Sequence, residues 1–268
     1  MPFVQSNGAR IHWEAQGSGT PVLLIMGHLY SSRMWYPLLP ALTRHHRAIW
    51  FDNRGTGDSD TTPGVTIEQF AADALAVLEA AGERSAHVYG VSMGGGIAAE
   101  FAMAYPERTR SVTLGCTMLK TEKTRMRGAQ KLIYGLPRWL VRAMFKRAKP
   151  EAYGSAAPRE AALHDIGVLS RDRFTMAGVR AQALAIAAYA TTTERARDRM
   201  TMPVLVLHGD EDKAVPVEKG RELHAIIPGS RYVEFKGAGH NYLVADNAGS
   251  TAAFLDFVAA ADRARGGE

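Results

Sequence analysis

Short runs of consecutive apolar residues recur along the chain, separated by segments whose apolar residues lie three or four positions apart. The apolar runs are 22–26, 48–51, 86–89, 111–114, 203–207 and 231–235. Runs of this length are typical of strands buried on both faces of a parallel sheet. Helical spacing is found in 66–81, 94–105, 217–226 and 248–263. This alternation predicts an α/β fold with a mostly parallel central sheet flanked by helices.

Two further elements are predicted near the N-terminus. Residues 2–15 alternate loosely around Asn7-Gly8, which indicates a β-hairpin with an Asn-Gly turn. Ser31 or Ser32 is suited to cap a helix that continues to about Arg44.

The strand pattern disappears between Thr117 and Thr201. This stretch is rich in Ala, Met and Arg, and its helical segments are interrupted by glycine and proline. We therefore predict a core formed by residues 1–118 and 201–268, with a helical insertion at 119–200 between two strands of the sheet.

The size and composition fit one large α/β domain with an insertion. The chain has 268 residues, of which 46% are hydrophobic and 22% charged. It contains no apolar run of about 18 residues and no basic-then-apolar leader, so we expect no stable membrane insertion. The single cysteine, Cys116, excludes an internal disulfide. Together these features favour a cytoplasmic protein.

The positive charge is concentrated in one segment. Between Lys120 and Lys149 there are ten Lys or Arg residues and one acid, Glu122, so this segment carries +9 and the rest of the chain 5 − 9 = −4. The high isoelectric point therefore does not indicate nucleic-acid binding, and no nucleic-acid motif is present. Amphipathic spacing at 138–147 favours a helix packed on the core. An acyl carrier or another anionic partner at 120–149 is the alternative.

A glycine-flanked serine lies where an apolar run meets a helical segment. The sequence Gly90-Val91-Ser92-Met93-Gly94 has the G-x-S-x-G spacing of a nucleophile elbow, a sharp strand-to-helix turn that exposes the serine hydroxyl. Glycine two positions either side of Ser92 removes Cβ atoms that would crowd the turn. We predict that Ser92 is a catalytic nucleophile.

A base and an acid for Ser92 are expected in loops that follow strands, because such loops meet at one edge of a parallel sheet. His240 is the one histidine of nine in the loop after the last predicted strand. The carboxylates Asp210, Glu211 and Asp212 follow the run that ends at Leu207, and spacing alone does not separate them. The order is serine, acid, histidine, as in α/β-hydrolases.

The expected oxyanion hole uses two backbone N–H groups. One belongs to Met93, the residue after the nucleophile, and the other to His28 in the loop after the strand at 22–26. The glycine-containing loop 52–60 is not a dinucleotide site, because it lacks the third glycine and no helix follows. We expect this loop to be pinned by Asp52 and Arg54.

The chain resembles the α/β-hydrolase fold superfamily, in particular serine hydrolases of the esterase, enol-lactonase and perhydrolase-like group. The resemblance extends from about Ile11 to Ala260 and is weakest in the insertion. Five segments carry it: Leu24–His28, Asp52–Ser59, Gly90–Gly95, Gly209–Pro216 and Gly237–His240. Met26-Gly27 departs from the His-Gly found in many relatives, which removes a side-chain contribution at that position.

The resemblance implies a triad and a mechanism. Its G-x-x-D-x-x-V-P pattern assigns the acid to Asp212, with Asp210 as the alternative. It implies a helical cap at 119–200 and hydrolysis of an ester, lactone or thioester of a small, fairly hydrophobic substrate through an acyl-enzyme. No metal or organic cofactor is implied. The alternatives are a thioesterase for carrier-bound acyl groups, a lyase or cyclase, and a ligand-binding protein of the same fold. The substrate-binding residues are left unassigned.

Overall fold

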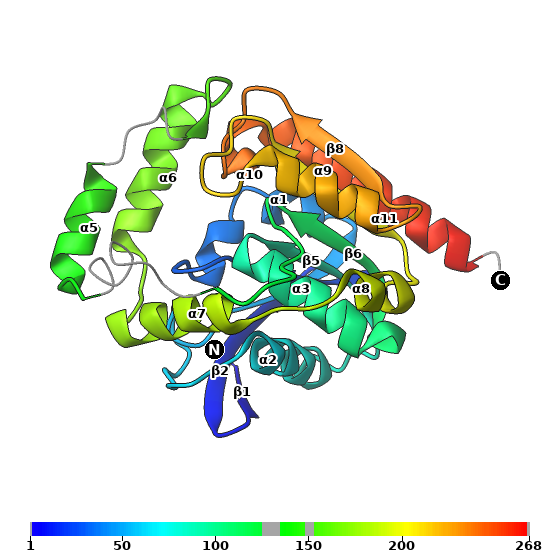
Figure 1. Ribbon diagram of the computed structural model, residues 1–268, viewed down its shortest axis with the longest axis horizontal. Coiled ribbons are helices and arrows are strands. Elements are labelled where there is room, and N and C mark those ends of the chain that lie inside the picture. The colour runs from blue at the N-terminus through cyan, green and yellow to red at the C-terminus, as the bar shows by residue number, and fades with distance from the viewer. Residues whose placement is uncertain (1, 125–134, 148–152, 267–268) are drawn as a thin grey trace.

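An eight-stranded sheet forms the centre of the molecule (Figure 1), a computed structural model that describes residues 2–124, 135–147 and 153–266. The strands are β1 (Phe3–Ser6), β2 (Ala9–Gln16), β3 (Thr20–Ile25), β4 (His46–Phe51), β5 (Ala86–Val91), β6 (Thr109–Gly115), β7 (Val204–Gly209) and β8 (Arg231–Phe235). Their order across the sheet is β1-β2-β4-β3-β5-β6-β7-β8. Pairing is antiparallel from β1 to β4 through β2, and parallel across the remaining strands.

The predicted hairpin is confirmed. Asn7 and Gly8 connect β1 and β2 with φ angles of +42° and +77°. Two successive positive φ angles match the twist of the flanking strands, and Asn-Gly is the pair that adopts them most readily.

Helices cover both faces of the sheet (Figure 1), as its apolar strands require. One face packs against α2 (Ile67–Ala80), α3 (Met93–Ala104) and α9 (Val217–Ile226). The other packs against η1 (Ser32–Trp35), α1 (Leu39–Leu42), α10 (Tyr242–Ala245) and α11 (Asn247–Gly266). The β3 side chains of Val22, Leu23 and Leu24 are fully buried between these layers. A strand covered on both faces cannot show the polar alternation of a half-exposed one.

Four described helices lie between β6 and β7: α5 (Arg138–Lys146), α6 (Arg159–Arg171), α7 (Met176–Ala188) and α8 (Thr193–Arg199). They form the predicted helical insertion, and Figure 1 shows α5 and α6 beside the sheet rather than within its layers. Ala181, Ala185 and Tyr189 join the core cluster of α2 and α3. Residues 125–134 and 148–152 of the predicted insertion lie outside the described residues, and its boundaries at 119 and 200 stay a prediction.

The predicted helix from Ser31 or Ser32 to Arg44 was wrong. The chain instead forms the short 3₁₀ segment η1 and the four-residue α1. Pro37 has no N–H to donate to the preceding turn, so a continuous helix cannot pass through it. Ser31 does cap η1, since its side chain accepts a hydrogen bond from the Arg33 N–H.

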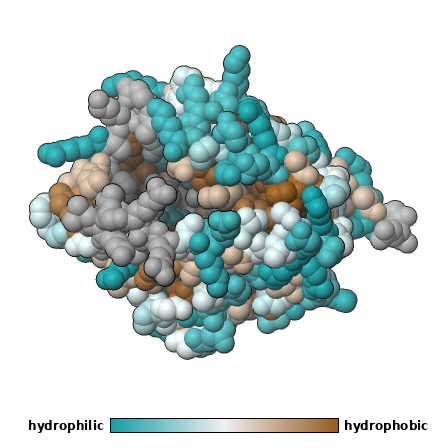
Figure 2. All heavy atoms as spheres, in the orientation of Figure 1, coloured by the Kyte–Doolittle hydropathy of each residue, from teal (hydrophilic) through white to brown (hydrophobic). Residues whose placement is uncertain are grey.

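The helices of the described chain give no candidate for a membrane span, because each is too short or too polar. Figure 2 shows hydrophobic residues gathered in the middle of the face seen in Figure 1, with hydrophilic side chains around them. The predicted cytoplasmic location stays a prediction.

Candidate active site

The turn between β5 and α3 has the geometry of a nucleophile elbow. Ser92 has φ +56° and ψ −121°, a conformation that non-glycine residues rarely adopt. A Cβ on Gly90 would lie 2.0 Å from the Gly94 carbonyl oxygen, and one on Gly94 would lie 2.1 Å from that of Ile25. Any side chain at either position would therefore force this turn open, which accounts for the two glycines of the motif.

The end of β6 holds the elbow in place. The Ser92 N–H donates to the Gly115 carbonyl at 2.8 Å, and the Thr117 hydroxyl donates to the Ser92 carbonyl at 2.8 Å. Met93 is the first residue of α3, so its N–H has no acceptor within the helix. This N–H is one of the two predicted oxyanion donors.

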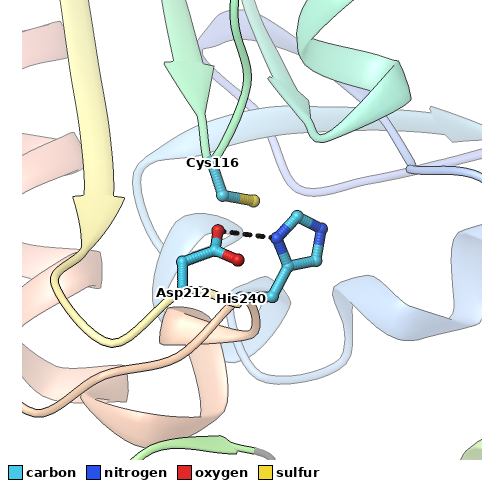
Figure 3. Close-up of side chains that lie close together, drawn as sticks. All are labelled: Cys116, Asp212 and His240. Atoms are coloured by element: carbon cyan, nitrogen blue, oxygen red, sulfur yellow. Dashed lines mark hydrogen bonds and ion pairs between the residues drawn. The ribbon is translucent and has the colours of Figure 1, made fainter. Parts of the chain in front are cut away.

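The structure brings together His240 and Asp212, the acid that the family resemblance implies (Figure 3). His240 Nδ1 lies 2.7 Å from Asp212 Oδ2. The Asp212 side chain is completely buried, and its Oδ1 accepts hydrogen bonds from the N–H groups of Ala214 and Val215 at 2.8 and 2.9 Å. The carboxylate is thereby oriented with one oxygen toward the imidazole.

Opposing influences set the charge of this pair. Burial favours a neutral Asp212, but hydrogen bonds from His208 and His240 outweigh it, so the pKa of this carboxyl lies below its ordinary value. Burial likewise disfavours a charged His240, but the neighbouring Cys116 side chain and Asp212 carboxylate together raise the pKa of the imidazole above 6.5. The pair is therefore built to stabilise an imidazolium, which forms when a histidine acts as a general base.

The other two candidate acids have different contacts. Asp210 Oδ1 accepts from the Gly237 N–H at 2.6 Å and so braces the loop that leads to His240. Glu211 accepts from the backbone and hydroxyl of Ser155, in the segment that precedes α6. Of the three carboxylates, only Asp212 hydrogen-bonds to His240.

Ser92 and His240 line the same pocket, which has a volume of about 280 Å³. His28 and Cys116 also line it. Among the described residues, Ser92 Oγ and His240 are not joined by a hydrogen bond. Catalytic hydrogen bonds often tighten only when substrate is bound, so the roles of both residues stay predictions.

The second predicted oxyanion donor lies in a loop fixed by the insertion. Gln182 of α7 is fully buried, and its Oε1 lies 2.9 Å from the Leu29 N–H and 3.1 Å from His28 Nδ1. Its Nε2 donates to the Arg54 carbonyl at 2.9 Å. The two backbone groups fix the orientation of the amide, so His28 Nδ1 must carry a proton to donate to Oε1. Burial lowers the pKa of His28 to about 4.

Strain in the same loop shows why it needs such support. Leu29 has φ +79°, which is unfavourable for a branched side chain. Asp172, which directly follows α6, also holds the loop. It accepts hydrogen bonds from the Ser31 N–H at 2.8 Å and from the Ser31 hydroxyl at 2.5 Å. These contacts fix the backbone beside His28.

The loop 52–60 is pinned as predicted. Asp52 accepts hydrogen bonds from the backbone and hydroxyl of Ser32 and lies 2.9 Å from His12 Nδ1. Arg54 makes a buried two-bond ion pair with Asp73 of α2, with both N–O distances 2.7 Å. Asp73 was not predicted, because nothing in the spacing of α2 indicates that an acid would be needed inside it.

Cys116 follows β6 and is buried, with its sulfur beside the Asp212–His240 pair (Figure 3). The ligand-type atoms of these three residues lie within 4.8 Å of one another, so they could present sulfur, oxygen and nitrogen to a soft cation. Because Asp212 already accepts hydrogen bonds from two backbone N–H groups and from His240, we interpret the cluster as an acid–base pair with a cysteine packed against it.

His208 was not predicted as part of the site. It is fully buried at the end of β7, with Nε2 2.9 Å from the Val215 carbonyl and 3.3 Å from Asp212 Oδ2. The carbonyl fixes the proton on Nε2, and the Val215 carbonyl and Asp212 Oδ2 share this one donor. The signal in the sequence that could have indicated this contact was the position of His208, four residues before Asp212.

Comparison with known proteins identifies the family. Residues 20–245 match the family model described as the alpha/beta hydrolase fold. The match spans most of the 268 residues, so the chain belongs to the α/β-hydrolase fold family, as the resemblance predicted. Family membership supports a hydrolase, and leaves the substrate open.

Individual relatives carry different names. "Putative carbamate hydrolase RutD" of Azorhizobium caulinodans is 41% identical over 115 residues, which are 42% of this chain and only 43% of that protein. "Putative non-heme bromoperoxidase BpoC" of Mycobacterium tuberculosis is 29% identical over 253 residues, 85% of this chain and 89% of that protein. A solved thermophilic esterase from Thermogutta terrifontis has a TM-score of 0.82 at 25% identity and covers 97% of this chain and 98% of its own.

Proposed function

We propose that this protein is a serine hydrolase that cleaves a carboxylic ester or a related acyl bond of a small, fairly hydrophobic substrate. One observation carries the proposal. Ser92, on a strained strand-to-helix turn, borders the same pocket as His240, and His240 is hydrogen-bonded at 2.7 Å to the buried carboxylate Asp212. A nucleophile, a base and an orienting acid in one pocket are the groups that acyl transfer requires.

The reaction has two steps. In the first, His240 takes the proton from Ser92 as Oγ attacks the acyl carbon, and Asp212 stabilises the resulting imidazolium. The N–H groups of Met93 and His28 hold the oxyanion. The bond to the leaving oxygen then breaks, and that oxygen takes the proton from His240. In the second step His240 takes a proton from a water molecule, whose oxygen attacks the acyl carbon. The bond to Ser92 Oγ then breaks, His240 returns the proton to Oγ, and the acid is released.

Apolar side chains support a hydrophobic substrate. Met34, Val91 and Leu243 line the pocket of Ser92 and His240 and are buried. Such walls gain free energy by covering apolar substrate surface, whereas the few polar groups fix its orientation. The printed names of the relatives span a carbamate hydrolase, a bromoperoxidase and an esterase, so we include a carbamate among the test substrates.

A fluorescent phosphonate that reacts only with activated serines tests the proposal directly. We expect it to label the wild-type protein, to label Ser92→Ala not at all, and to label His240→Ala weakly. Ser92→Ala should also lower turnover of short-chain esters on the order of 10⁴-fold or more. Circular dichroism of each variant would establish that it is folded.

The result that contradicts the proposal is a folded wild-type protein that neither reacts with the phosphonate nor hydrolyses esters, lactones, thioesters or carbamates. Saturable binding of a small ligand by such a protein would indicate a binding member of the fold.

The acyl-carrier partner at 120–149 stays a prediction. Residues 125–134 and 148–149 of this segment lie outside the described residues. Two of its cations are turned inward, because Arg142 donates to the Asp172 carbonyl at 2.7 Å and Lys120 donates to three carbonyls around the end of α7. Charge reversal at these two positions would therefore disturb packing, and Arg147 is the better position at which to test a carrier.

A further inference from the structure

Ser92 borders two separate pockets. The first, about 280 Å³, is the one that His240 and His28 line, and we call it the His240 pocket. The second, about 110 Å³, is lined by Met93 and Gly96 of α3 and by residues of neighbouring segments, and we call it the Gly96 pocket. His240 does not line the Gly96 pocket, and Met93 does not line the His240 pocket. The nucleophile is thus the meeting point of two cavities of unequal size.

The chemistry of acyl transfer assigns each cavity a role, given the function proposed above. The leaving oxygen must receive its proton from His240, so the leaving group must lie in the pocket that His240 borders. The acyl chain points away from the leaving oxygen at the carbon that Ser92 attacks. From the two pockets we infer that the substrate is an ester of a short, uncharged acyl group, held in the Gly96 pocket, with a larger apolar leaving group in the His240 pocket.

The volumes give the expected sizes. An apolar cavity of about 150 Å³ takes up benzene, which corresponds to roughly 25 Å³ per carbon. By that measure the Gly96 pocket holds an acyl chain of about four carbons. The His240 pocket has more than twice this volume and accommodates an aromatic ring or a branched alcohol.

The walls of the Gly96 pocket are mostly apolar, through Ile67, Ile186 and Val215. The one cation, Lys120, has its ammonium 2.7 Å from the carbonyls of Ile186 and Ala187 and 3.2 Å from that of Tyr189. Its three protons are committed to these main-chain oxygens. An uncharged chain is therefore the better occupant than a second carboxylate.

Gly96 itself determines how much room the acyl chain has. The other two glycines of this helical turn leave no room for a side chain. A Cβ on Gly94 would lie 2.1 Å from the nearest neighbouring atom, and a Cβ on Gly95 would lie 2.6 Å from one. At Gly96 a Cβ would meet nothing within 4 Å. Because Gly96 lines the pocket and a Cβ there meets open space, we expect a side chain at this position to reduce the pocket volume without displacing the backbone. Alanine or valine also suits a helix better than glycine.

The experiment compares nitrophenyl acetate, butanoate and octanoate on wild type and on Gly96→Val. Wild type should hydrolyse acetate and butanoate with kcat/KM at least tenfold above octanoate. Gly96→Val should lower kcat/KM for butanoate about tenfold or more relative to acetate, because crowding by one methylene is worth that much in a tight pocket. Gly96→Ala should show the same trend more weakly, and Ile186→Ala should improve octanoate.

A matched change in the other pocket is the control. Ala214 lines the His240 pocket, and its side chain is exposed. Ala214→Leu should lower hydrolysis of naphthyl acetate relative to ethyl acetate and leave the acetate-to-butanoate ratio unchanged. Preference of the wild type for octanoate would overturn the inference. So would a Gly96→Val effect on the leaving group rather than on the acyl chain.

Phosphonate labelling separates this inference from the proposed function. If Ser92 is labelled and esters are hydrolysed, but chain length does not respond to Gly96→Val, the function stands and the assignment of the pockets is wrong. If neither labelling nor hydrolysis occurs, both fail together.

Discussion

The loops at the edge of the sheet and the helical insertion contribute to the candidate site in different ways. Ser92, Asp212 and His240 all follow strands, and each lies in a short motif that can be read locally. The insertion contributes single buried polar side chains that hold loops of the site. Gln182 binds Leu29 and Asp172 binds Ser31, both in the loop that carries His28, and Asp165 binds Asn241 beside His240.

The difference is one of sequence distance. These three contacts join residues 153, 141 and 76 positions apart. The reacting groups are thus determined by strand-end turns, whereas the alignment of the loops around them depends on pairs that only the folded chain brings together. Variants of Ser92, Asp212 and His240 should therefore abolish chemistry, and variants in the insertion should weaken it by degrees.

The largest contrast is expected between two neighbouring acids at the sheet edge. Asp212→Asn should lower kcat about 10⁴-fold, because an amide no longer stabilises the imidazolium of His240. Asp210→Asn should lower it less than tenfold, since Asp210 contacts only the backbone at Gly237 among the described residues. Steady-state kinetics on a short-chain ester measures both. Equal losses would indicate that the acid was assigned incorrectly.

A second variant tests how firmly the sheet-edge loops are held. Asp73→Ala leaves the buried guanidinium of Arg54 without its carboxylate and should lower the free energy of unfolding by about 3–5 kcal/mol. Denaturant titration measures this value. Glu222→Gln, which breaks the exposed pair with Lys219, is the control and should leave the denaturation midpoint almost unchanged. A small effect at Asp73 would mean that water readily solvates Arg54.

These contacts explain what could be predicted from the sequence. The apolar runs predicted the six strands from β3 to β8, most clearly β5 and β7, which are buried along their whole length, and the Asn-Gly turn predicted β1 and β2. The elbow glycines predicted the position of Ser92. Pro37 ended a helix that the pattern alone extended to Arg44. Gln182 and Asp73 could not be predicted, because a glutamine or aspartate in an amphipathic helix looks the same whether it faces solvent or a backbone N–H group many residues away.

A smaller effect is expected from the insertion. Gln182→Leu removes the acceptor for the Leu29 N–H and should release the strained loop that carries the His28 donor. We expect kcat to fall about 10–100-fold, short of the loss of a whole oxyanion donor, with KM changed little. Leu184→Ala, on the exposed side of the same helix, is the control. If kcat is retained in a folded Gln182→Leu protein, the insertion does not align the oxyanion hole.

The smallest effect concerns two histidines that line one pocket and have opposite pKa shifts. Against the effect of burial, Cys116 and Asp212 raise the pKa of His240 above 6.5, whereas burial against the insertion lowers that of His28 to about 4. His240 must be neutral to accept the Ser92 proton, so kcat/KM should fall as the pH drops through the raised pKa, while His28 stays neutral and leaves the loop unchanged. In NMR spectra the ring signals of His240 should titrate above pH 6.5, whereas those of His28 should not change between pH 5 and 8. Titration of His28 in this range would show that water reaches its imidazole despite the contact with Gln182. The insertion would then act as a mobile cover rather than a fixed support.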